Sequence, residues 1–418
     1  MPAVYLGWVN TAFLLAAATF VIPFGRLSDI YGRKRIFISG VSVLLCASLL
    51  IGSAVSSMMI ILSRVLQGFG SSMIFATSMP IVVSAVSPEE RGRALGITTA
   101  AVYFGLSTGP FVGGLITQHL GWRFIFWLNI PLCLILLSVA FFMLRGDWAE
   151  ARGARFDMAG AAILGLSLLL TMYGFSNLPS GLAGTMTAIG IGGIVLFVFF
   201  EMRQQHPILD IGLFRHNAVF AFSNLAALIN YAATATVSFL LSLYLQQVKG
   251  LSPQAAGLVL ISQPIIQAVI SPLAGRLSDK IEPRTLASAG MAVTLVGLLL
   301  LVFLGSGTGM TYIIAVLMVL GLGFGLFSSP NTNAIMSAVK RESYGVAGAT
   351  VASARQIGMM FSMGIVMMIL SILLGRAEIK PENYPQFLTC MRIAFIVFAV
   401  MCFGGIFASL ARGKINRS

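Results

Sequence analysis

Charge is scarce in this chain, and negative charge is the scarcer of the two. Of the 418 residues, 13 are Asp or Glu and 26 are Lys or Arg, so charged residues make up 9% of the sequence. A typical soluble domain has roughly 25%. All the acids are expected in loops or at the ends of apolar segments. No pair of carboxylates inside those segments is therefore available for acid–base catalysis.

Residues that hold metals or form disulfides are also few. The four cysteines stand in apolar segments without metal-ligand spacing, at Cys46, Cys133, Cys390 and Cys402. The three histidines stand in loops or at segment ends, outside any H-E-x-x-H pattern, at His119, His206 and His216. No Walker A loop is present, so ATP is not expected to drive this protein directly. We therefore expect no metal, no cofactor and no enzymatic activity, and a packing role for the cysteines.

Apolar residues take the place of the missing charge. They make up 58% of the sequence, and the mean hydropathy is +0.95. A helix that crosses a bilayer needs about 20 predominantly apolar residues. We predict thirteen spans, at 4–24, 36–56, 59–83, 94–117, 122–144, 158–176, 185–202, 217–247, 255–274, 285–304, 311–338, 345–374 and 388–411. The chain is therefore expected to be an all-α polytopic membrane protein.

The positive charges lie mostly on one side of the predicted spans. Nineteen of the 26 Lys and Arg residues fall in alternate connections and in the C-terminal tail, at 25–35, 84–93, 145–157, 201–216, 275–284, 340–343 and 412–418. The positive-inside rule makes these segments cytoplasmic. We therefore expect a multi-pass protein of the cell membrane with a cytoplasmic C-terminus. Its net charge of +13 is expected to face anionic lipid and not nucleic acid.

Two parts of the sequence repeat each other. The pentapeptide "GRLSD" occurs at 25–29 and again at 275–279. Two predicted spans after each copy, "ERGRALG" is echoed by "ESYGVAG". Matched loops on one face indicate parallel repeats related by an axis along the membrane normal. We expect an N-terminal bundle at 1–144, an inserted two-helix linker with charged loops at 145–216, and a C-terminal six-span bundle at 217–418.

Several motifs resemble those of the Major Facilitator Superfamily, and in particular its fourteen-span drug:proton antiporters. These motifs are "GRLSDIYGRKR" (25–35), "RVLQGFGSS" (64–72), "GLSTGPFVGGLI" (105–116), "GWRFIFWLNIP" (121–131) and "RQIG" (355–358). The resemblance covers nearly the whole chain and implies the major facilitator fold, with two pseudo-symmetric helical bundles plus the inserted pair. Aligned in this way, residue 1 falls just before the family's second span. The family's first span, which carries an intramembrane Asp, has no counterpart.

The resemblance implies a secondary active transporter that exports hydrophobic small molecules or drugs in exchange for protons, by alternating access of the two bundles. The expected partners are the lipid bilayer, a small hydrophobic substrate, protons and a missing N-terminal span. Two other functions stay open. One is export of a specific metabolite or a siderophore-like anion, and the other is a non-transporting, incomplete membrane protein.

Arg64 lies inside a predicted span, roughly 8 Å from its outer end at about 1.5 Å per residue. A charge at the centre of a span costs about 2.5–3.5 kcal/mol on insertion scales, and the sequence offers no carboxylate at the same depth. Two interpretations follow. The guanidinium reaches headgroups or backbone carbonyls, or it is a proton-coupled Arg of the resembling family, with Gln67 beside it and its acid partner on the missing span.

The predicted span 94–117 contains a proline among four glycines, at Gly105, Gly109, Pro110, Gly113 and Gly114. Glycines four residues apart let two helices approach closely, and a proline within a helix favours a kink. Tight packing alone would explain these residues. Alternatively they form the antiporter motif that they resemble, which in the family separates exporters from importers.

A cytoplasmic gate is expected at the charged loop and its repeat, from Gly25, Asp29, Gly32, Arg33 and Asp279. The glycines permit a tight turn, and Arg33 helps to set the topology. Asp29 is expected to cap the start of the other bundle's helix near residue 345, and Asp279 the start near residue 94. The alternative is a solvated turn that only sets topology.

Polar residues within apolar spans are candidates for the lining of a substrate cavity. They are Asn10, Thr11, Tyr103, Asn230, Tyr231, Asn331, Arg355 and Gln356, together with Asn224 and Asn333. Each could equally form a hydrogen bond between helices. Arg355, near the middle depth of its span, is the expected anchor if the substrate is an anion.

Overall fold

The computed structural model describes residues 3–87, 91–144, 146–149, 151–205, 207–209, 211–278, 281–339, 344–375 and 379–413. Every regular element in these residues is helical. The first half comprises α1 (Ala3–Tyr31), α2 (Arg33–Gly52), α3 (Ser57–Ala85), α4 (Arg91–His119) and α5 (Arg123–Phe142). Next come α6 (Met158–Asn177), α7 (Gly181–Glu201) and the short α8 (Ile211–His216). The second half comprises α9 (Ala218–Thr234), α10 (Val237–Leu243), the π-helical η1 (Tyr244–Val248), α11 (Pro253–Leu260), α12 (Ser262–Ser278), α13 (Pro283–Leu301), α14 (Met310–Ser337), α15 (Tyr344–Leu373), the 3₁₀ turn η3 (Pro381–Asn383) and α16 (Tyr384–Ala411).

A helix or a run of adjoining helices stands at every predicted span. Twelve helical segments of the described residues are long and apolar enough to cross a membrane. The remaining predicted span, 94–117, coincides with α4, whose side chains are described only in part. Two spans are less regular than the sequence suggested, because 217–247 is divided into α9, α10 and η1, and 255–274 into α11 and α12.

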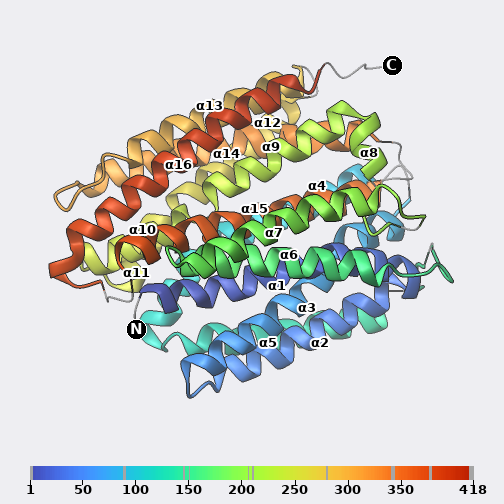
Figure 1. Cartoon of the computed structure of the whole chain (residues 1–418), viewed down its shortest axis with the longest axis horizontal. Coiled ribbons are helices and arrows are strands. Elements are labelled where there is room, and N and C mark those ends of the chain that lie inside the picture. The colour runs from blue at the N-terminus through green and yellow to red at the C-terminus, as the bar shows by residue number, and fades with distance from the viewer. Residues whose placement is uncertain are drawn as a thin grey trace.

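The long helices run side by side, so that their connections gather at the two ends of the molecule (Figure 1). The described chain starts at one end, and its C-terminus lies at the other. We call the second end the basic face. It is where α1, α7 and α16 finish and where α2 and α6 begin, and it carries the described parts of the Lys- and Arg-rich connections identified above. The membrane spans lie between this face and the opposite one.

The repeat in the sequence is visible as a repeat in helix packing. Gly40 on α2 meets Gly70 on α3, and Gly290 on α13 meets Gly323 on α14 in the same way. A Cβ on any of the four would stand 2.7–2.9 Å from the backbone oxygen of its partner glycine, closer than real Cβ atoms come. Only glycine therefore allows these two helix pairs to pack backbone against backbone. The matched contacts agree with two pseudo-symmetric bundles.

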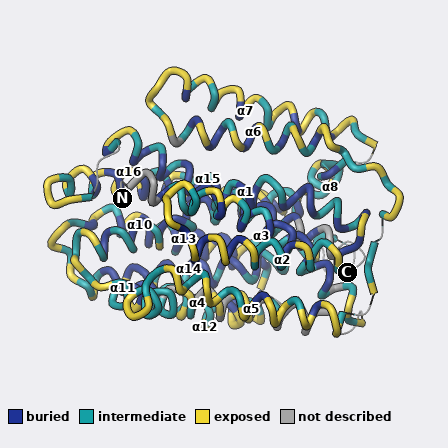
Figure 2. Tube along the Cα trace, turned by 90° about the horizontal axis from the view of Figure 1, so that it is seen from below, coloured by how far each residue is buried: buried dark blue, intermediate teal, exposed yellow. Residues whose placement is uncertain are grey.

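The inserted helices α6 and α7 form a hairpin that packs where the two halves meet. They lie side by side along one edge of the molecule, next to α15 and α1 (Figure 2). The Met172 side chain on α6 fills the space beside Gly364 on α15, and the Ser371 hydroxyl of α15 donates to the Leu178 carbonyl at 2.8 Å. An apolar cluster joins the hairpin to both halves through Leu14, Ala18, Leu168, Met172, Met360 and Met363. Methionine side chains are flexible and fill the irregular space between the hairpin and the two halves.

Candidate functional site

Arg64 is held between α1 and α3 by neutral groups. It stands seven residues after the start of α3, or about 10 Å along the helix axis. Its Nε donates to the Val9 carbonyl at 2.9 Å, Nη1 to Gln67 Oε1 at 2.6 Å and Nη2 to Asn10 Oδ1 at 3.0 Å. The guanidinium carbon also lies 4.7 Å from the centre of the Phe13 ring, a cation–π distance. In the residues that the structure describes, no ion pair to Arg64 is found.

The Arg64 network unites three of the sequence candidates and leaves one out. Arg64 and Gln67, which come from one motif, are in contact with each other, and Asn10, expected only as a cavity residue, joins them. Thr11 is fully buried, and its hydroxyl donates to the carbonyl of Gly7 one turn earlier. Such back-bonding satisfies the hydroxyl inside α1, so Thr11 does not join the network.

A second group of candidates lies on the helices of the other half. Asn230 on α9 is fully buried, and neither polar atom of its side chain has a hydrogen-bond partner among the residues that the structure describes. On α15, the buried Gln356 has an unpartnered Oε1. Tyr231 packs its ring against Phe324 in an edge-to-face contact at 5.5 Å. Buried amides are nearly always hydrogen-bonded in proteins, so these atoms are places where a ligand or water would bind.

Two glutamines of α12 belong with these amides and were not singled out from the sequence. Gln267 is buried, and within the described part of the chain its Nε2 has no hydrogen-bond partner, nor has Oε1 of Gln263. The pattern "SQPIIQ" places them four residues apart, on one face of an otherwise apolar helix. Two glutamines at this spacing are the feature of the sequence from which these site residues could have been predicted.

Arg355 reaches from the second half to the first. Its guanidinium carbon lies 5.6 Å from the centre of the Phe75 ring on α3. Within the described part of the chain, that aromatic face is the contact that the structure records for this cation, and no carboxylate pairs with it. The side chain is partly exposed, in the middle of α15. Arg355 therefore offers a positive charge at the seam between the two halves.

Asn331 lies at the basic face and is engaged by Arg412. The Arg412 Nη1 donates to Asn331 Oδ1 at 3.0 Å and to the Ser223 hydroxyl at 3.2 Å, while Nε donates to the Ser409 carbonyl at 2.8 Å. The Asn331 amide in turn donates to the Ser223 carbonyl at 3.1 Å. Both the oxygen and the nitrogen of the Asn331 side-chain amide are thus hydrogen-bonded within the second bundle. Asn333, its neighbour, donates to the Ser278 hydroxyl at 2.9 Å.

The glycine–proline motif of α4 contacts the second half at one of its glycines. A Cβ on Gly114 would stand 2.6 Å from the Pro253 carbonyl oxygen at the start of α11. A Cβ on Gly105, Gly109 or Gly113 would meet nothing within 4 Å. Close helix approach therefore explains Gly114 and leaves the other three to a different role. The side chains of Pro110 and of the cavity candidate Tyr103 lie outside the described residues.

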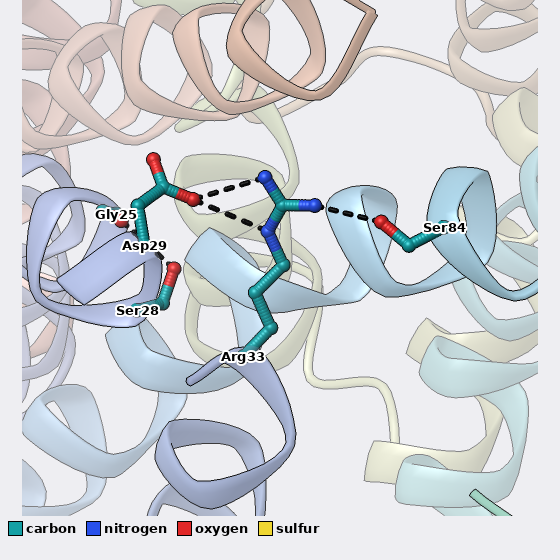
Figure 3. A network of polar contacts seen from close by, with 5 residues as sticks. All are labelled: Gly25, Ser28, Asp29, Arg33 and Ser84. Atoms are coloured by element: carbon teal, nitrogen blue, oxygen red, sulfur yellow. Dashed lines mark hydrogen bonds and ion pairs between the residues drawn. The ribbon is translucent and has the colours of Figure 1, made fainter. Parts of the chain in front are cut away.

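The charged loop forms an ion pair inside its own half. Asp29 Oδ1 accepts from Nε and Nη2 of Arg33 at 3.2 and 3.0 Å, and Arg33 Nη1 donates to the Ser84 hydroxyl of α3 at 2.7 Å (Figure 3). Arg33 is 5% exposed, so it ties the turn to the end of α3. The predicted contact of Asp29 near residue 345, and Asp279 with its target near residue 94, lie outside the described residues or side chains.

Glycine is required at position 32 of this loop. Its φ is +111°, a value that L-residues rarely adopt. A Cβ there would also stand 2.0 Å from Oδ1 of Asp147, whose other oxygen pairs with Arg35 at 2.6 Å. In contrast, Gly25 lies within α1, and a Cβ on it would meet nothing within 4 Å. The tight turn thus needs one of the two predicted glycines.

Comparison with known proteins identifies relatives along the whole chain. The sequence profile of the Major Facilitator Superfamily matches residues 1–147 and 224–415. The riboflavin transporter RibZ of Clostridioides difficile is 31% identical over 360 residues, which cover 85% of this chain and 77% of that protein. The multidrug resistance protein Stp of Mycobacterium tuberculosis is 30% identical over 384 residues, covering 90% and 71%. A solved structure from work on proton dependent oligopeptide transporters superposes with a TM-score of 0.66 at 16% identity, covering 99% of this chain and 91% of that one.

Proposed function

Because the chain belongs to the Major Facilitator Superfamily and is therefore a multi-pass membrane transporter, we propose that it exports hydrophobic small molecules in exchange for protons. The observation that carries this proposal is the Arg64 network, a positive charge inside a span that is bonded to neutral acceptors. Charges within spans are costly and mark ion or substrate pathways. An acidic group that enters the network would displace Asn10, and its protonation would release Arg64 again.

Release of Arg64 would act on the packing of α1 against α3. The guanidinium joins the Val9 carbonyl and Asn10 on α1 to Gln67 on α3, so the two helices are tied while these bonds are intact. α1 in turn packs against α15 and against α6 of the hairpin. A change at Arg64 thus reaches the seam between the two halves through one helix.

The proposed substrate is largely apolar with one or more hydrogen-bonding groups. Buried amides on α9, α12 and α15, at Asn230, Gln267 and Gln356, have polar atoms without partners in the described residues. A ligand that satisfies such groups gains hydrogen bonds that the empty site lacks. The similarity to Stp, a protein named for multidrug resistance, supports this substrate class.

The proposal is tested in proteoliposomes that contain the purified full chain. The lumen is made more acidic than the outside, and the protein molecules that matter are those with the basic face outward. For these molecules, we expect a fluorescent lipophilic dye to accumulate in the lumen. Protons are expected to leave the lumen at a rate proportional to the entry of the dye. A protonophore dissipates the pH gradient without the protein, so it should abolish dye accumulation, and empty liposomes serve as the control. Dye accumulation without proton movement would contradict the exchange, and no accumulation of any dye in a panel would contradict the substrate class.

Export of an organic anion is the second candidate, and Arg355 favours it. The guanidinium stands at the seam over an aromatic ring, without a carboxylate partner in the described chain, which is how a site for a planar anion would be built. The similarity to RibZ, a protein named as a riboflavin transporter, is compatible with a planar polar substrate.

Substitution of Arg355 separates the two candidates. If the substrate is an anion, Arg355→Ala is expected to reduce anion transport by about tenfold or more, because a charge-assisted hydrogen bond contributes about 1.5–3 kcal/mol. Transport of cationic dyes should be unchanged, and Arg355→Lys should retain part of the anion transport. Initial rates for a matched pair of anionic and cationic dyes measure this preference. An equal loss for both dyes in Arg355→Ala would assign Arg355 a structural role.

A further inference from the structure

Two carboxylates face each other at the basic end of the inserted hairpin. Asp157 immediately precedes α6, and its Oδ1 accepts a hydrogen bond from the Gly160 backbone N–H at 2.9 Å. Glu201 is the last residue of α7 and is 2% exposed. The hairpin thus brings together two acids that are separated by two membrane spans in the sequence.

The facing oxygens of these carboxylates are close together and have no partners. The point where a Cβ on Gly160 would stand lies 2.5 Å from Glu201 Oε1 and 2.6 Å from Asp157 Oδ2, so these two oxygens are no more than about 5 Å apart. Both oxygens are buried, and neither has a hydrogen-bond partner among the described residues. The glycine at position 160 leaves the room in which they face each other.

Two negative charges cannot both be accommodated at this place. The N-terminus of α6 stabilises one of them, through the bond from Gly160 N–H and the helix dipole. A second charge within about 5 Å, away from water, repels the first and has lost its own hydration. Carboxylates in this position hold one proton between them, and the pair then titrates as a unit.

We propose that Asp157 and Glu201 form a proton-binding site in which one proton lies between Glu201 Oε1 and Asp157 Oδ2. Asp157 caps α6 through Oδ1, and the protonated Glu201 donates to its other oxygen. The second oxygen of Glu201, Oε2, accepts from the Leu209 backbone N–H at 3.5 Å. The site therefore connects both helices of the hairpin to the segment that leads into α8 and α9.

The charged surroundings of the site are simple in the described residues. Among the residues of α6, α7, the connection before α6 and the segment 207–209, the charged side chain that interacts electrostatically with Glu201 is Asp157. His206 and Asp210, which flank that segment, lie outside the described residues. The site is at the basic face, whereas Arg64 lies in the part of α3 toward the opposite face. It is therefore separate from the Arg64 network and does not depend on the proposed exchange of drug for protons.

Infrared spectroscopy of the purified full chain in lipid nanodiscs tests the site, because a protonated carboxylic acid has a C=O stretching band that a carboxylate lacks. At neutral pH in potassium buffer, the wild-type protein is expected to show such a band, and Glu201→Gln to lack it. The glutamine amide can donate to Asp157 as the protonated acid does, so this variant should fold. Glu382→Gln, at an exposed acid on the opposite face, is the matched control and should keep the band.

Asp157→Asn provides an independent readout. The asparagine oxygen still caps α6, but the negative neighbour of Glu201 is gone. The band is therefore expected to disappear at a pH lower by at least about one unit than in the wild type. A flat difference spectrum between wild type and Glu201→Gln, or an unchanged titration midpoint in Asp157→Asn, would overturn the proposal. Loss of the wild-type band on addition of sodium at constant pH would also overturn it, since a metal ion and not a proton would then bridge the acids.

Discussion

Replacement of Arg64 by alanine is expected to uncouple dye export from the proton gradient. The substitution removes two hydrogen bonds that join α3 to α1, to Val9 and Asn10, and a third within α3, to Gln67. A hydrogen bond to a charged group contributes about 1.5–3 kcal/mol, and about 1.4 kcal/mol corresponds to tenfold in a rate. Export driven by a pH gradient should therefore fall by about tenfold or more. Arg64→Lys keeps the charge without the planar fork and should be impaired to a lesser degree.

Two transport modes distinguish a coupling defect from a folding defect. Counterflow, in which labelled dye exchanges with unlabelled dye without a gradient, requires alternating access but no net proton movement. We expect Arg64→Ala to retain counterflow while losing gradient-driven accumulation. Arg123→Ala is the matched control, since Arg123 also donates to a backbone carbonyl, of Ala54 at 2.8 Å, and stacks on an aromatic ring. If Arg64→Ala accumulates dye at the wild-type rate, the coupling role of Arg64 is wrong.

Replacement of Arg412 by methionine is expected to destabilise the second bundle. Arg412 is 1% exposed and bonds to Ser223 on α9, Asn331 on α14 and Ser409 on α16. Burial lowers its pKa to about 10, so the guanidinium is still charged at neutral pH. Removal of the donor leaves several buried acceptors without partners, each at a cost of about 1–3 kcal/mol. We expect a net loss of about 3 kcal/mol, because methionine also removes the cost of burying the charge.

The cysteines of α16 provide a local measure of this loss. Cys390 and Cys402 are buried in the second bundle, whereas Cys46 on α2 is exposed. In a background with Cys46→Ser and Cys133→Ser, which also removes the buried cysteine of α5 in the first half, a maleimide dye that becomes fluorescent on reaction with thiols reports the temperature at which Cys390 and Cys402 become accessible. Arg412→Met should lower that temperature by several degrees. Arg392→Met, at an exposed position of the same helix, should leave it nearly unchanged. Equal shifts in the two variants would argue against the Arg412 network as the cause.

Much of the helical architecture follows from local sequence. The sequence contains apolar runs near the length of a membrane span, and these runs are interrupted by charge or by Gly, Pro and Ser. They place each predicted span close to its observed helix. Ser56, Ser180 and Ser252 each accept a hydrogen bond from the amide three residues on and so start a helix. These signals act within a few residues of the chain, which is why they can be read without tertiary contacts. The irregularity of α9, α10 and η1 was missed because π-turns have no comparable local signature.

The candidate site was predicted less completely, because its side chains find partners on distant helices. The motif "RVLQGFGSS" identified Arg64 and Gln67, which lie one turn apart, but not the carbonyl of Val9. The structure pairs the acid Asp29 with Arg33, four residues away, whereas its expected contact near residue 345 of the other half lies outside the described side chains and stays a prediction. Local pairing at that spacing is available at little entropic cost. The sequence could have indicated this pair.

By itself, the sequence determined the approximate positions of the apolar spans, the concentration of positive charge in alternate connections, the internal repeat and the presence of a charge inside α3. These properties depend on hydrophobicity, charge and residue spacing, all of which are local. The tertiary structure alone decided which charges and amides are satisfied. It buried Arg412 of a basic tail among neutral partners, left Asn230 without any, and brought Asp157 against Glu201. The physical reason is that burial and hydrogen bonding depend on which helix faces meet, and residue spacing along one helix does not specify its neighbours.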